Sequence, residues 1–315
     1  MDKRLTTMSI PKAVIIVHKG ALGDFLQTWP SLLALSWYFQ STSLYWAGRD
    51  AYRVWTDPLG LISCPDRIRR AVDSLYATHS WPEDLQDCLI IWFGLHTRPT
   101  EIDFPGLHFL PGILPTGLTP PWQVYAAGLH RLGISPVSGW RQTWQDLFVL
   151  SQIKKRFSQA LIFPGAGHPA KCWPLANYLK MASWLDGAGI EPVFVLGPAE
   201  RERRLEVQNF QLLHPADFEQ LQCALNHADL VLGNDSGPLH LAGLLNCKGV
   251  ALFGPADAGQ WGPAGLSHIQ SGVPCSPCTR IGRIQCARPV CMDNISLQRI
   301  QKEIQALINE KRKKD

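Results

Sequence analysis

Short apolar runs alternate along the chain with longer segments whose apolar residues recur at helical spacing. The first run, Ala13–Val17, is rich in β-branched side chains, which is typical of a buried parallel strand. A glycine-containing turn, 19–24, follows this run and leads into a segment that places Phe25, Trp29 and Leu33 on one helix face. The pattern therefore begins with a strand, a glycine turn and a helix.

The alternation continues in two blocks. In the first block we expect strands at Leu44–Trp46 and Leu89–Phe93, a proline- and glycine-rich loop over Phe104–Pro121, and a helix at Trp122–Leu132. The second block predicts four strands, at Leu161–Phe163, Pro192–Leu196, Leu230–Gly233 and Gly249–Phe253. It also predicts helices at Leu175–Ala188, Ala199–Val207, Phe218–His227 and Gly237–Leu245, and a last helix from about Ser296.

Two blocks of alternating strands and helices predict an α/β protein with two parallel sheets, each covered by helices on both faces. A length of 315 residues agrees with two domains. We place them at residues 1–152 and 153–315, and the last helix could pack back on the first domain.

Composition and charge exclude several other classes of protein. A hydrophobic content of 46% with a net charge of +4 excludes disorder, and that charge is too small to indicate nucleic acid. The longest apolar run, Cys88–Leu95, is far below the roughly 18 residues of a membrane span. No signal peptide is evident at the N-terminus, so we expect a cytoplasmic protein. The odd count of nine cysteines argues against a disulfide framework.

The first candidate site follows the first strand. Gly20 and Gly23 let the backbone approach a ligand, and Asp24 comes at the carboxyl end of that strand, where ligands bind in such sheets. A carboxylate there can act as a general base or simply cap the following helix, and spacing alone leaves both interpretations open.

Two further glycine loops suit a phosphate group. Gly165 and Gly167 precede Lys171 between a strand and a helix, so backbone donors and a cation can converge on an anion. This loop could also be an ordinary connection, but that interpretation does not explain the lysine.

In the other loop, Asp235, Ser236 and Gly237 lie where the chain leaves a strand and begins a helix, and His240 follows one turn later. There the alternatives are a simple helix cap and a core histidine.

Cys275 and Cys278 form a Cys-x-x-Cys pair, with Cys286 and Cys291 following in the same segment. Four thiolates could bind a structural zinc ion tetrahedrally, but reduced free cysteines are the ordinary state in the cytosol. Arg280, Arg283 and Arg288 lie among them and make the segment a candidate anion contact.

The motifs and their order resemble glycosyltransferase family 9, the ADP-heptose:lipopolysaccharide heptosyltransferases. The most specific piece is residues 234–242 together with Leu252-Phe253-Gly254-Pro255. Residues 19–24, Lys171-x-Trp173-Pro174 and Gly197-x-x-Glu200 add to the match. Residues 45–145 match no motif of the family, and His168-Pro169-Ala170 lacks the hydroxyl residues that some members have in that loop.

The resemblance implies a GT-B architecture, in which two Rossmann-like domains face each other across a cleft. It implies an inverting transfer of heptose from ADP-heptose to a lipopolysaccharide inner-core acceptor, with no metal required for catalysis. By the same resemblance, Asp24 would be the general base. Gly20 and Gly23 would lie beside it on the acceptor side. Lys171 and the Ser236–Gly237 helix start would stabilise the departing ADP, while Glu200 would contact the ribose and His240 the diphosphate.

The implied partners are an ADP-sugar and a lipid-linked core oligosaccharide, with peripheral contact to the inner face of the cytoplasmic membrane and no nucleic acid. The basic last six residues, which carry +2, would favour that membrane contact. A related transferase using another nucleotide sugar and a non-catalytic nucleotide-sugar-binding protein stay open as alternatives. The acceptor sugar stays open as well.

Overall fold

The computed structural model describes residues 11–75, 80–95, 104–114, 118–150, 158–278, 284, 286 and 289–312. The chain divides into two compact units, Met1–Trp140 and Arg141–Asp315. The expected domain boundary at residues 152 and 153 lies outside the described residues.

The first unit contains a five-stranded parallel sheet with the order β3-β2-β1-β4-β5. Its strands are β1 (Ala13–His18), β2 (Ser43–Trp46), β3 (Ile62–Ser63), β4 (Cys88–Gly94) and β5 (Leu107–Pro111). Strands are added on one side of β1 up to β3 and then on the other side from β4. The order therefore reverses between β1 and β4, and ligands bind outside the carboxyl ends of strands at such a point.

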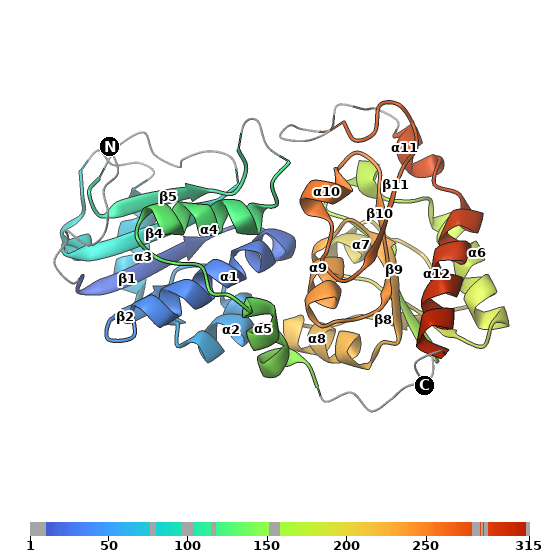
Figure 1. Ribbon diagram of the computed structural model, residues 1–315, viewed down its shortest axis with the longest axis horizontal. Coiled ribbons are helices and arrows are strands. Elements are labelled where there is room, and N and C mark those ends of the chain that lie inside the picture. Colours follow the sequence, from blue (N-terminus) through green and yellow to red (C-terminus); the bar gives the residue numbers. More distant parts are fainter. Residues whose placement is uncertain are drawn as a thin grey trace. The chain divides into compact units, whose positions relative to one another are not determined.

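Helices cover both faces of this sheet (Figure 1). The helices are α1 (Leu22–Tyr38), α2 (Arg53–Thr56), α3 (Asp66–Ser74) and α4 (Pro121–Arg131), and α5 (Trp140–Phe148) begins at the last residue of the unit. Because side chains alternate along a strand, Ile15 and Val17 of β1 pack with Val72 of α3 on one face. On the opposite face, His18 lies 6.0 Å from Phe25 of α1, measured between ring centroids.

The second unit contains a six-stranded parallel sheet with the order β11-β10-β9-β6-β7-β8. Its strands are β6 (Gln159–Phe163), β7 (Glu191–Val195), β8 (Gln211–Leu213), β9 (Leu230–Asn234), β10 (Gly249–Phe253) and β11 (Ser267–Gln270). Here the strand order reverses between β6 and β9. The predicted phosphate loops follow these two strands.

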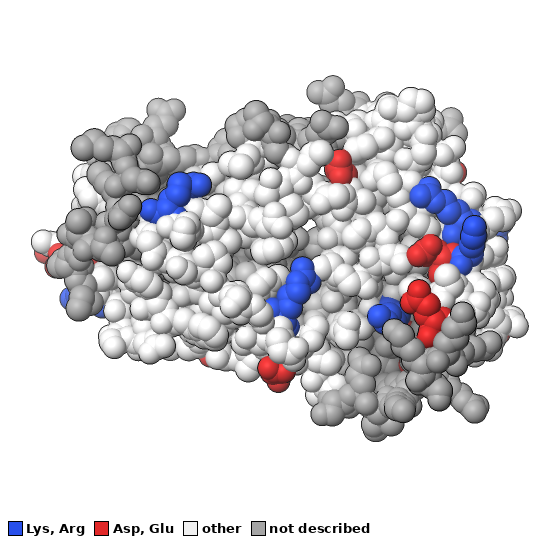
Figure 2. Space-filling view, in the orientation of Figure 1, with Lys and Arg blue, Asp and Glu red and all other residues white. Residues whose placement is uncertain are grey.

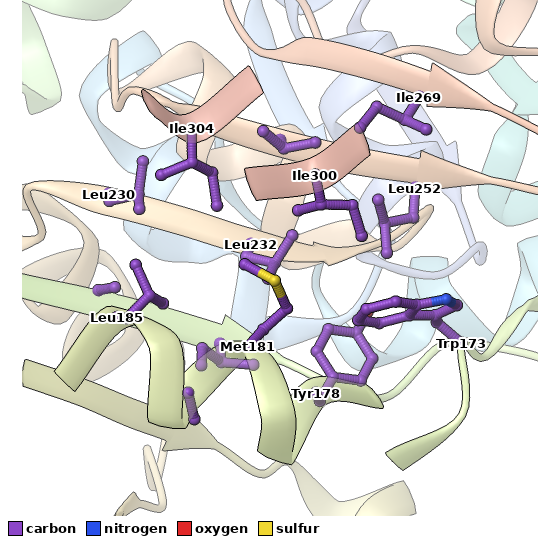
Figure 3. Close-up of a cluster of buried hydrophobic side chains, with 14 of the residues drawn as sticks. Trp173, Tyr178, Met181, Leu185, Leu230, Leu232, Leu252, Ile269, Ile300 and Ile304 are labelled. Atoms are coloured by element: carbon purple, nitrogen blue, oxygen red, sulfur yellow. The ribbon is translucent and has the colours of Figure 1, made fainter. Parts of the chain in front are cut away.

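The helices of the second unit are α6 (Leu175–Gly187), α7 (Pro198–Glu202), α8 (Phe218–His227), α9 (Gly237–Leu244), α10 (Ala258–Trp261), α11 (Val290–Asp293) and α12 (Leu297–Arg312). Figure 3 shows the core of this unit, in which Met181 of α6 and Ile300 and Ile304 of α12 pack with Leu232 and Leu252 of the sheet. Each of these side chains is fully or almost fully buried, and such burial contributes about 2 kcal/mol per side chain. The last helix therefore packs within the second unit.

The α/β fold class with two parallel sheets is confirmed. The prediction of a continuous loop over Phe104–Pro121 is wrong, because β5 (Leu107–Pro111) lies inside it and pairs with β4. This strand is at the edge of the sheet, where a terminal proline costs no hydrogen bond to a second neighbour. The helix predicted at Ala199–Val207 ends earlier, at Glu202, and Arg204 has a left-handed backbone with φ of 52°.

Few charged side chains appear on the face of the molecule drawn in Figure 2, in keeping with a charged content of only 18%. Within the described part of the chain, no helix is long and apolar enough to cross a membrane.

Candidate functional site

The loops that follow β6 and β9 are joined by the buried side chain of Asn234. Its Oδ1 atom accepts hydrogen bonds of 2.9 Å from the backbone N–H of Trp173 and from the hydroxyl of Tyr178. Its Nδ2 atom donates to the carbonyls of Pro164, at 2.8 Å, and Gly165, at 3.3 Å. One fully buried amide therefore fixes both loops at the point where the strand order reverses.

Three charged or titratable side chains meet between these loops. Lys171 Nζ lies 2.7 Å from Asp235 Oδ2, and His240 Nε2 lies 3.9 Å from Asp235 Oδ1. The Lys171 side chain keeps 29% of its surface exposed, whereas Asp235 keeps 9%. Burial lowers the pKa of His240, although Asp235 acts in the opposite direction. His240 is therefore neutral at neutral pH, and Lys171 is the cation that a ligand can reach.

The start of α9 presents an unused hydroxyl beside this cluster. Ser236 is the N-cap residue of α9, yet its side chain makes no capping hydrogen bond. The hydroxyl is buried and has no hydrogen-bond partner among the described residues. Gly237 is the first residue of the helix, so unpaired backbone N–H groups begin there.

Glu200 belongs to α7, the helix that follows β7, and lies beside Gly165. Its Oε2 atom accepts a hydrogen bond of 2.9 Å from the backbone N–H of Gly197. A Cβ atom added to Gly165 would come within 1.8 Å of Glu200 Oε1, so this glycine is needed for Glu200 to lie where it does. The same test places no atom within 4 Å of Gly167. The predicted donor residues thus all lie in the loops after β6, β7 and β9 or in the helices that these loops lead into: Gly165, Gly167, Lys171, Glu200, Asp235, Ser236, Gly237 and His240.

Asp24 is the third residue of α1 in the first unit, and its Oδ2 atom accepts a hydrogen bond of 3.2 Å from the backbone N–H of Ala21. Asp24 therefore does cap the helix. Gly20 allows a close approach here, because an added Cβ would lie 2.9 Å from the His18 ring and 3.0 Å from Asp24 Cβ. Gly23 lies within α1, one residue before Asp24.

Buried aromatic and imidazole groups surround the Asp24 turn. The Tyr52 hydroxyl donates a hydrogen bond of 3.1 Å to the carbonyl of Gly20. Burial raises the pKa of Tyr52 to about 12, and it raises the pKa of Tyr125 as well, with Asp24 adding to both shifts. Burial and then Arg49 lower the pKa of His18 to about 4. At neutral pH, Asp24 therefore has neutral phenols and a neutral imidazole as neighbours.

Sequence reasoning did not single out Asn234, Tyr178, His18 or Tyr125 as parts of these sites. Asn234 directly precedes Asp235 at the end of a predicted strand, and that position was a usable signal. Tyr178 carried no signal, because its hydrogen bond to Asn234 joins residues 56 positions apart.

The four loop cysteines are neighbours in the structure. The pKa of Cys278 is raised by burial and by the thiols of Cys286 and Cys275, and Cys278 and Cys275 act in the same direction on the largely buried Cys291. All four are free thiols. In the described segments, however, no group of three or more histidine, cysteine or acidic side chains is arranged to hold a metal ion. The zinc site stays a prediction, and Arg280, Arg283 and Arg288 lie outside the described residues.

Two Rossmann-like parallel sheets, one with an anion-suited cluster at its reversal point, are the arrangement found in enzymes of GT-B architecture. Residues 145–287 match the model of Glycosyltransferase family 9 (heptosyltransferase). The resemblance to family 9 is thereby confirmed, and the family model covers the greater part of the second unit.

Individual relatives agree with this family. The chain is 22% identical to lipopolysaccharide heptosyltransferase 1 of Pseudomonas aeruginosa, over 94% of this chain and 98% of the relative. It is 29% identical to lipopolysaccharide heptosyltransferase 3 of Escherichia coli, but that match spans only 35% of each chain. The structure of the E. coli heptosyltransferase WaaC with ADP superimposes with a TM-score of 0.62 at 16% identity, covering 93% of this chain and 99% of that one. At this identity, the structural match establishes the fold.

Proposed function

We propose that the protein is an inverting glycosyltransferase that moves heptose from ADP-heptose to a lipopolysaccharide inner-core acceptor. The observation that supports this most is the cluster of Lys171, Asp235 and His240 beside the free hydroxyl of Ser236. The Pseudomonas relative, which matches over nearly its whole length, is named as a lipopolysaccharide heptosyltransferase. Together they favour a nucleoside-diphosphate sugar as donor.

The donor residues would act on the leaving group. As the bond between the anomeric carbon and the phosphate oxygen breaks, its electron pair stays on that oxygen, and negative charge grows on the diphosphate. The Lys171 ammonium and the N–H groups at the start of α9 are suited to stabilise this charge, and the Ser236 hydroxyl can donate a hydrogen bond to it. Glu200 can accept hydrogen bonds from the ribose hydroxyls.

Asp24 would act on the acceptor. An acceptor hydroxyl attacks the anomeric carbon from the face opposite the diphosphate, forms the new C–O bond and transfers its proton to the Asp24 carboxylate. The neighbouring Tyr52 and Tyr125 stay protonated at neutral pH because burial raises their pKa values. They therefore do not compete with Asp24 for the proton.

The direct test is release of ADP from ADP-heptose in the presence of truncated lipopolysaccharide. The informative variant is Asp24→Asn, because an amide oxygen can still accept the hydrogen bond from Ala21 N–H but the side chain cannot take the proton. We expect a folded protein that binds ADP but turns over at least about 100-fold more slowly. Full turnover by Asp24→Asn would show that Asp24 is not the general base. Turnover with another nucleotide sugar but not with ADP-heptose would show that the donor is that other sugar nucleotide. Binding of ADP-heptose without any transfer would make this a non-catalytic binding protein.

The proposal includes no metal in the transfer step, and turnover should persist in excess EDTA. Metal can occur in a protein of this fold, since TibC from E. coli, whose structure matches with a TM-score of 0.62 at 14% identity, is an iron-containing dodecameric glycosyltransferase. For Cys275, Cys278, Cys286 and Cys291 we propose a structural zinc ion. Metal analysis of the purified protein tests it, and the absence of a stoichiometric ion rejects the site.

The proposal places the protein in the cytoplasm, at the inner face of the membrane that holds the acceptor. Cosedimentation with anionic liposomes tests this, with a chain lacking residues 311–315 as the comparison. Equal binding by the two chains would remove the basic tail from the proposal.

A further inference from the structure

The first unit contains a cavity of about 290 Å³ that is separate from the predicted donor residues and lined by three cationic side chains. Lys19 follows β1, Arg49 follows β2, and Arg69 projects from α3, while Ala47, Gly48, Val72 and Asp73 complete the lining. We call this the Arg49 pocket. It lies at the carboxyl ends of β1 and β2, the end of the sheet that also carries Asp24.

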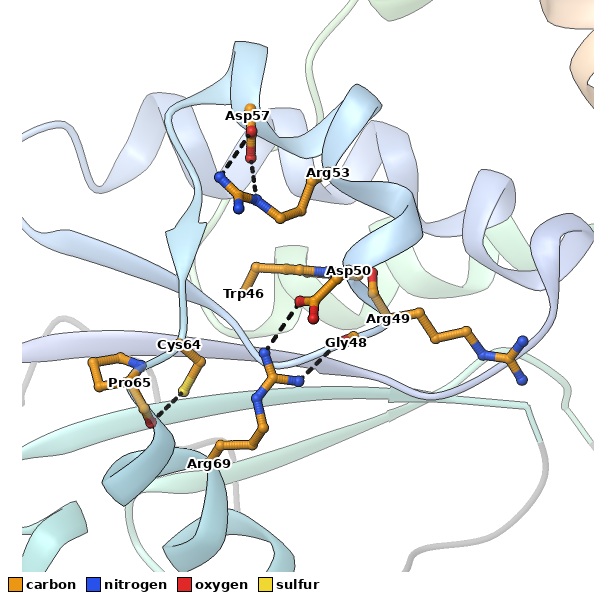
Figure 4. Close-up of polar contacts among 9 residues, drawn as sticks. All are labelled: Trp46, Gly48, Arg49, Asp50, Arg53, Asp57, Cys64, Pro65 and Arg69. Atoms are coloured by element: carbon orange, nitrogen blue, oxygen red, sulfur yellow. Dashed lines mark hydrogen bonds and ion pairs between the residues drawn. The ribbon is translucent and has the colours of Figure 1, made fainter. Parts of the chain in front are cut away.

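The loop that carries Arg49 is held from two sides (Figure 4). The indole N–H of the buried Trp46 donates a hydrogen bond of 3.0 Å to the carbonyl of Arg49. Arg69 Nη1 donates one of 3.0 Å to the carbonyl of Gly48. An added Cβ on Gly48 would come within 2.2 Å of the Trp46 ring and 2.8 Å of the His18 carbonyl, so only glycine fits there. The pocket is therefore built by packed, hydrogen-bonded groups.

The charges of the Arg49 pocket do not balance. Lys19 is paired with Asp73, and Arg69 Nη2 lies 3.4 Å from Asp50 Oδ1. The Arg49 guanidinium has no hydrogen-bond or ion-pair partner among residues that the structure describes, and Figure 4 shows it extending away from Asp50. Asp73 and Asp50 thus offset two of the three cations, and the exposed Arg49 can bind an anion without losing a partner.

The Arg49 pocket adjoins the residues around the proposed base. The positive charge of Arg49 lowers the pKa of His18 and that of Tyr52, and the negative charge of Asp24 raises the pKa of Tyr52. Lys19 Nζ lies 5.7 Å from the ring centroid of Trp92 on β4, so it sits at the point where the strand order of the first sheet reverses. The Arg49 pocket and the proposed base therefore share one segment after β1, which carries Lys19 at its start and Asp24 at its end.

We propose that the Arg49 pocket binds an anionic group of the acceptor, a sugar-acid carboxylate or a sugar phosphate, and so positions the acceptor hydroxyl. This inference rests on the proposed transfer to a core oligosaccharide. The guanidinium of Arg49 matches the planar geometry of a carboxylate or phosphate, and Lys19 and Arg69 add charge behind it.

The test compares Arg49→Gln with the matched control Arg53→Gln. Arg53 is four residues away and forms a two-point ion pair with Asp57, at 3.1 and 3.0 Å, outside the pocket lining. We expect Arg49→Gln to raise the KM for the acceptor about tenfold or more and to leave the KM for ADP-heptose unchanged. Arg53→Gln should change neither value. Equal acceptor KM values for the Arg49→Gln variant and the wild type overturn the proposal.

Chemically altered acceptors identify the anion. Reduction of the carboxyl groups, or removal of the phosphates by hydrogen fluoride, should raise the wild-type KM by the same factor as Arg49→Gln. Whichever treatment does so names the group, and Arg49→Gln should then lose its sensitivity to that treatment. If neither treatment changes the KM, the proposal is wrong.

A binding measurement without donor keeps the inference separate from the proposed function. Calorimetry with the lipopolysaccharide core alone should show weaker binding to Arg49→Gln than to Arg53→Gln, even if no heptose transfer occurs. Transfer without this difference rejects the pocket and leaves the function standing. Weaker binding of the core by Arg49→Gln without any heptose transfer supports the pocket and rejects the proposed function.

Discussion

The hydroxyl of Tyr178 donates a 2.9 Å hydrogen bond to the side-chain oxygen of Asn234, and both residues are fully buried. Tyr178 belongs to α6 and Asn234 to the end of β9, so this contact joins a helix to the strand beside the candidate donor site. Burial raises the pKa of Tyr178 well above its usual value, so the phenol keeps its proton and remains a donor. The hydrogen bonds of the Asn234 amide therefore hold the segments after β6 and β9 together.

Replacing Asn234 by Ala should destabilise the second unit strongly. The change leaves the Tyr178 hydroxyl and the Trp173 N–H without their partner, and each unpaired buried group costs about 1–3 kcal/mol. We expect a total loss of about 3 kcal/mol in the free energy of unfolding, measured by urea denaturation. Asn177→Ala on α6 is the control and should lie within about 0.5 kcal/mol of the wild type. A loss of only about 0.5 kcal/mol in the free energy of unfolding of Asn234→Ala would show that these hydrogen bonds are not needed for stability.

Replacing Lys171 by Met should reduce turnover without unfolding the protein. The side chain keeps 29% of its surface exposed, and its methylenes survive the change, while the cation available to a diphosphate is lost. We expect kcat/KM to fall about 100-fold, the size typical for loss of one charge-stabilising donor. Lys180→Met, on the exposed face of α6, is the control for a lost surface charge. Equal kinetics for the two variants would remove Lys171 from the mechanism.

Replacing Gly165 by Ala should weaken ADP binding through Glu200. The new methyl group would occupy the position of the Glu200 carboxylate, which is the movable end of a flexible side chain, so the carboxylate is displaced while the backbone holds. We expect ADP affinity, measured by calorimetry, to fall about tenfold with little change in thermal stability. Gly187→Ala at the end of α6 meets no atom within 4 Å and should bind ADP normally. Normal ADP binding by Gly165→Ala would contradict a role for Glu200.

His18 should make the stability of the first unit depend on pH. Its pKa falls from 6.5 to about 4 on folding, so below pH 6.5 the unfolded chain takes up a proton that the folded unit does not. The contribution of the neutral His18 to the free energy of unfolding is fully present above pH 6.5 and is lost as the pH falls toward 4. The expected loss is about 2 kcal/mol between about pH 7.5 and about pH 5.

Hydrogen exchange of the β1 amides measures this loss in the first unit alone. The His18→Phe variant keeps an aromatic ring beside Phe25 but cannot titrate, so its stability should fall less over the same range. Identical pH profiles for the variant and the wild type would show that another group is responsible.

The buried strands were predictable because a parallel strand covered on both faces must be apolar throughout. Residues Phe218–His227 and Gly249–Phe253 form the helix and strand that their patterns predict. By contrast, β5 has two buried residues among five and ends at a proline, so its sequence resembles a loop. Only pairing with β4 makes it a strand, and that pairing depends on the rest of the sheet.

The positions of the candidate donor residues in the fold were predictable for a similar reason, whereas their role stays a prediction. Lys171 and Asp235 each follow a recognisable strand, and the carboxyl ends of neighbouring parallel strands meet. The contacts that hold them were not predictable, because Asn234 reaches partners 56 to 70 positions away through a side chain. The Arg49 pocket was hidden likewise, since Lys19, Arg49 and Arg69 converge only after β1, β2 and α3 have packed.

Gly165, Glu200 and Asp235 come from the segments that follow three different strands, so their arrangement exists only when the second sheet is complete. A ligand that touches all three loops binds the folded unit and not the unfolded chain, and its binding energy adds to the stability of that unit. Saturating ADP should therefore raise the unfolding temperature of the second unit and leave that of the first unchanged. Ligand occupancy thus becomes a thermodynamic marker of which half of the chain is folded.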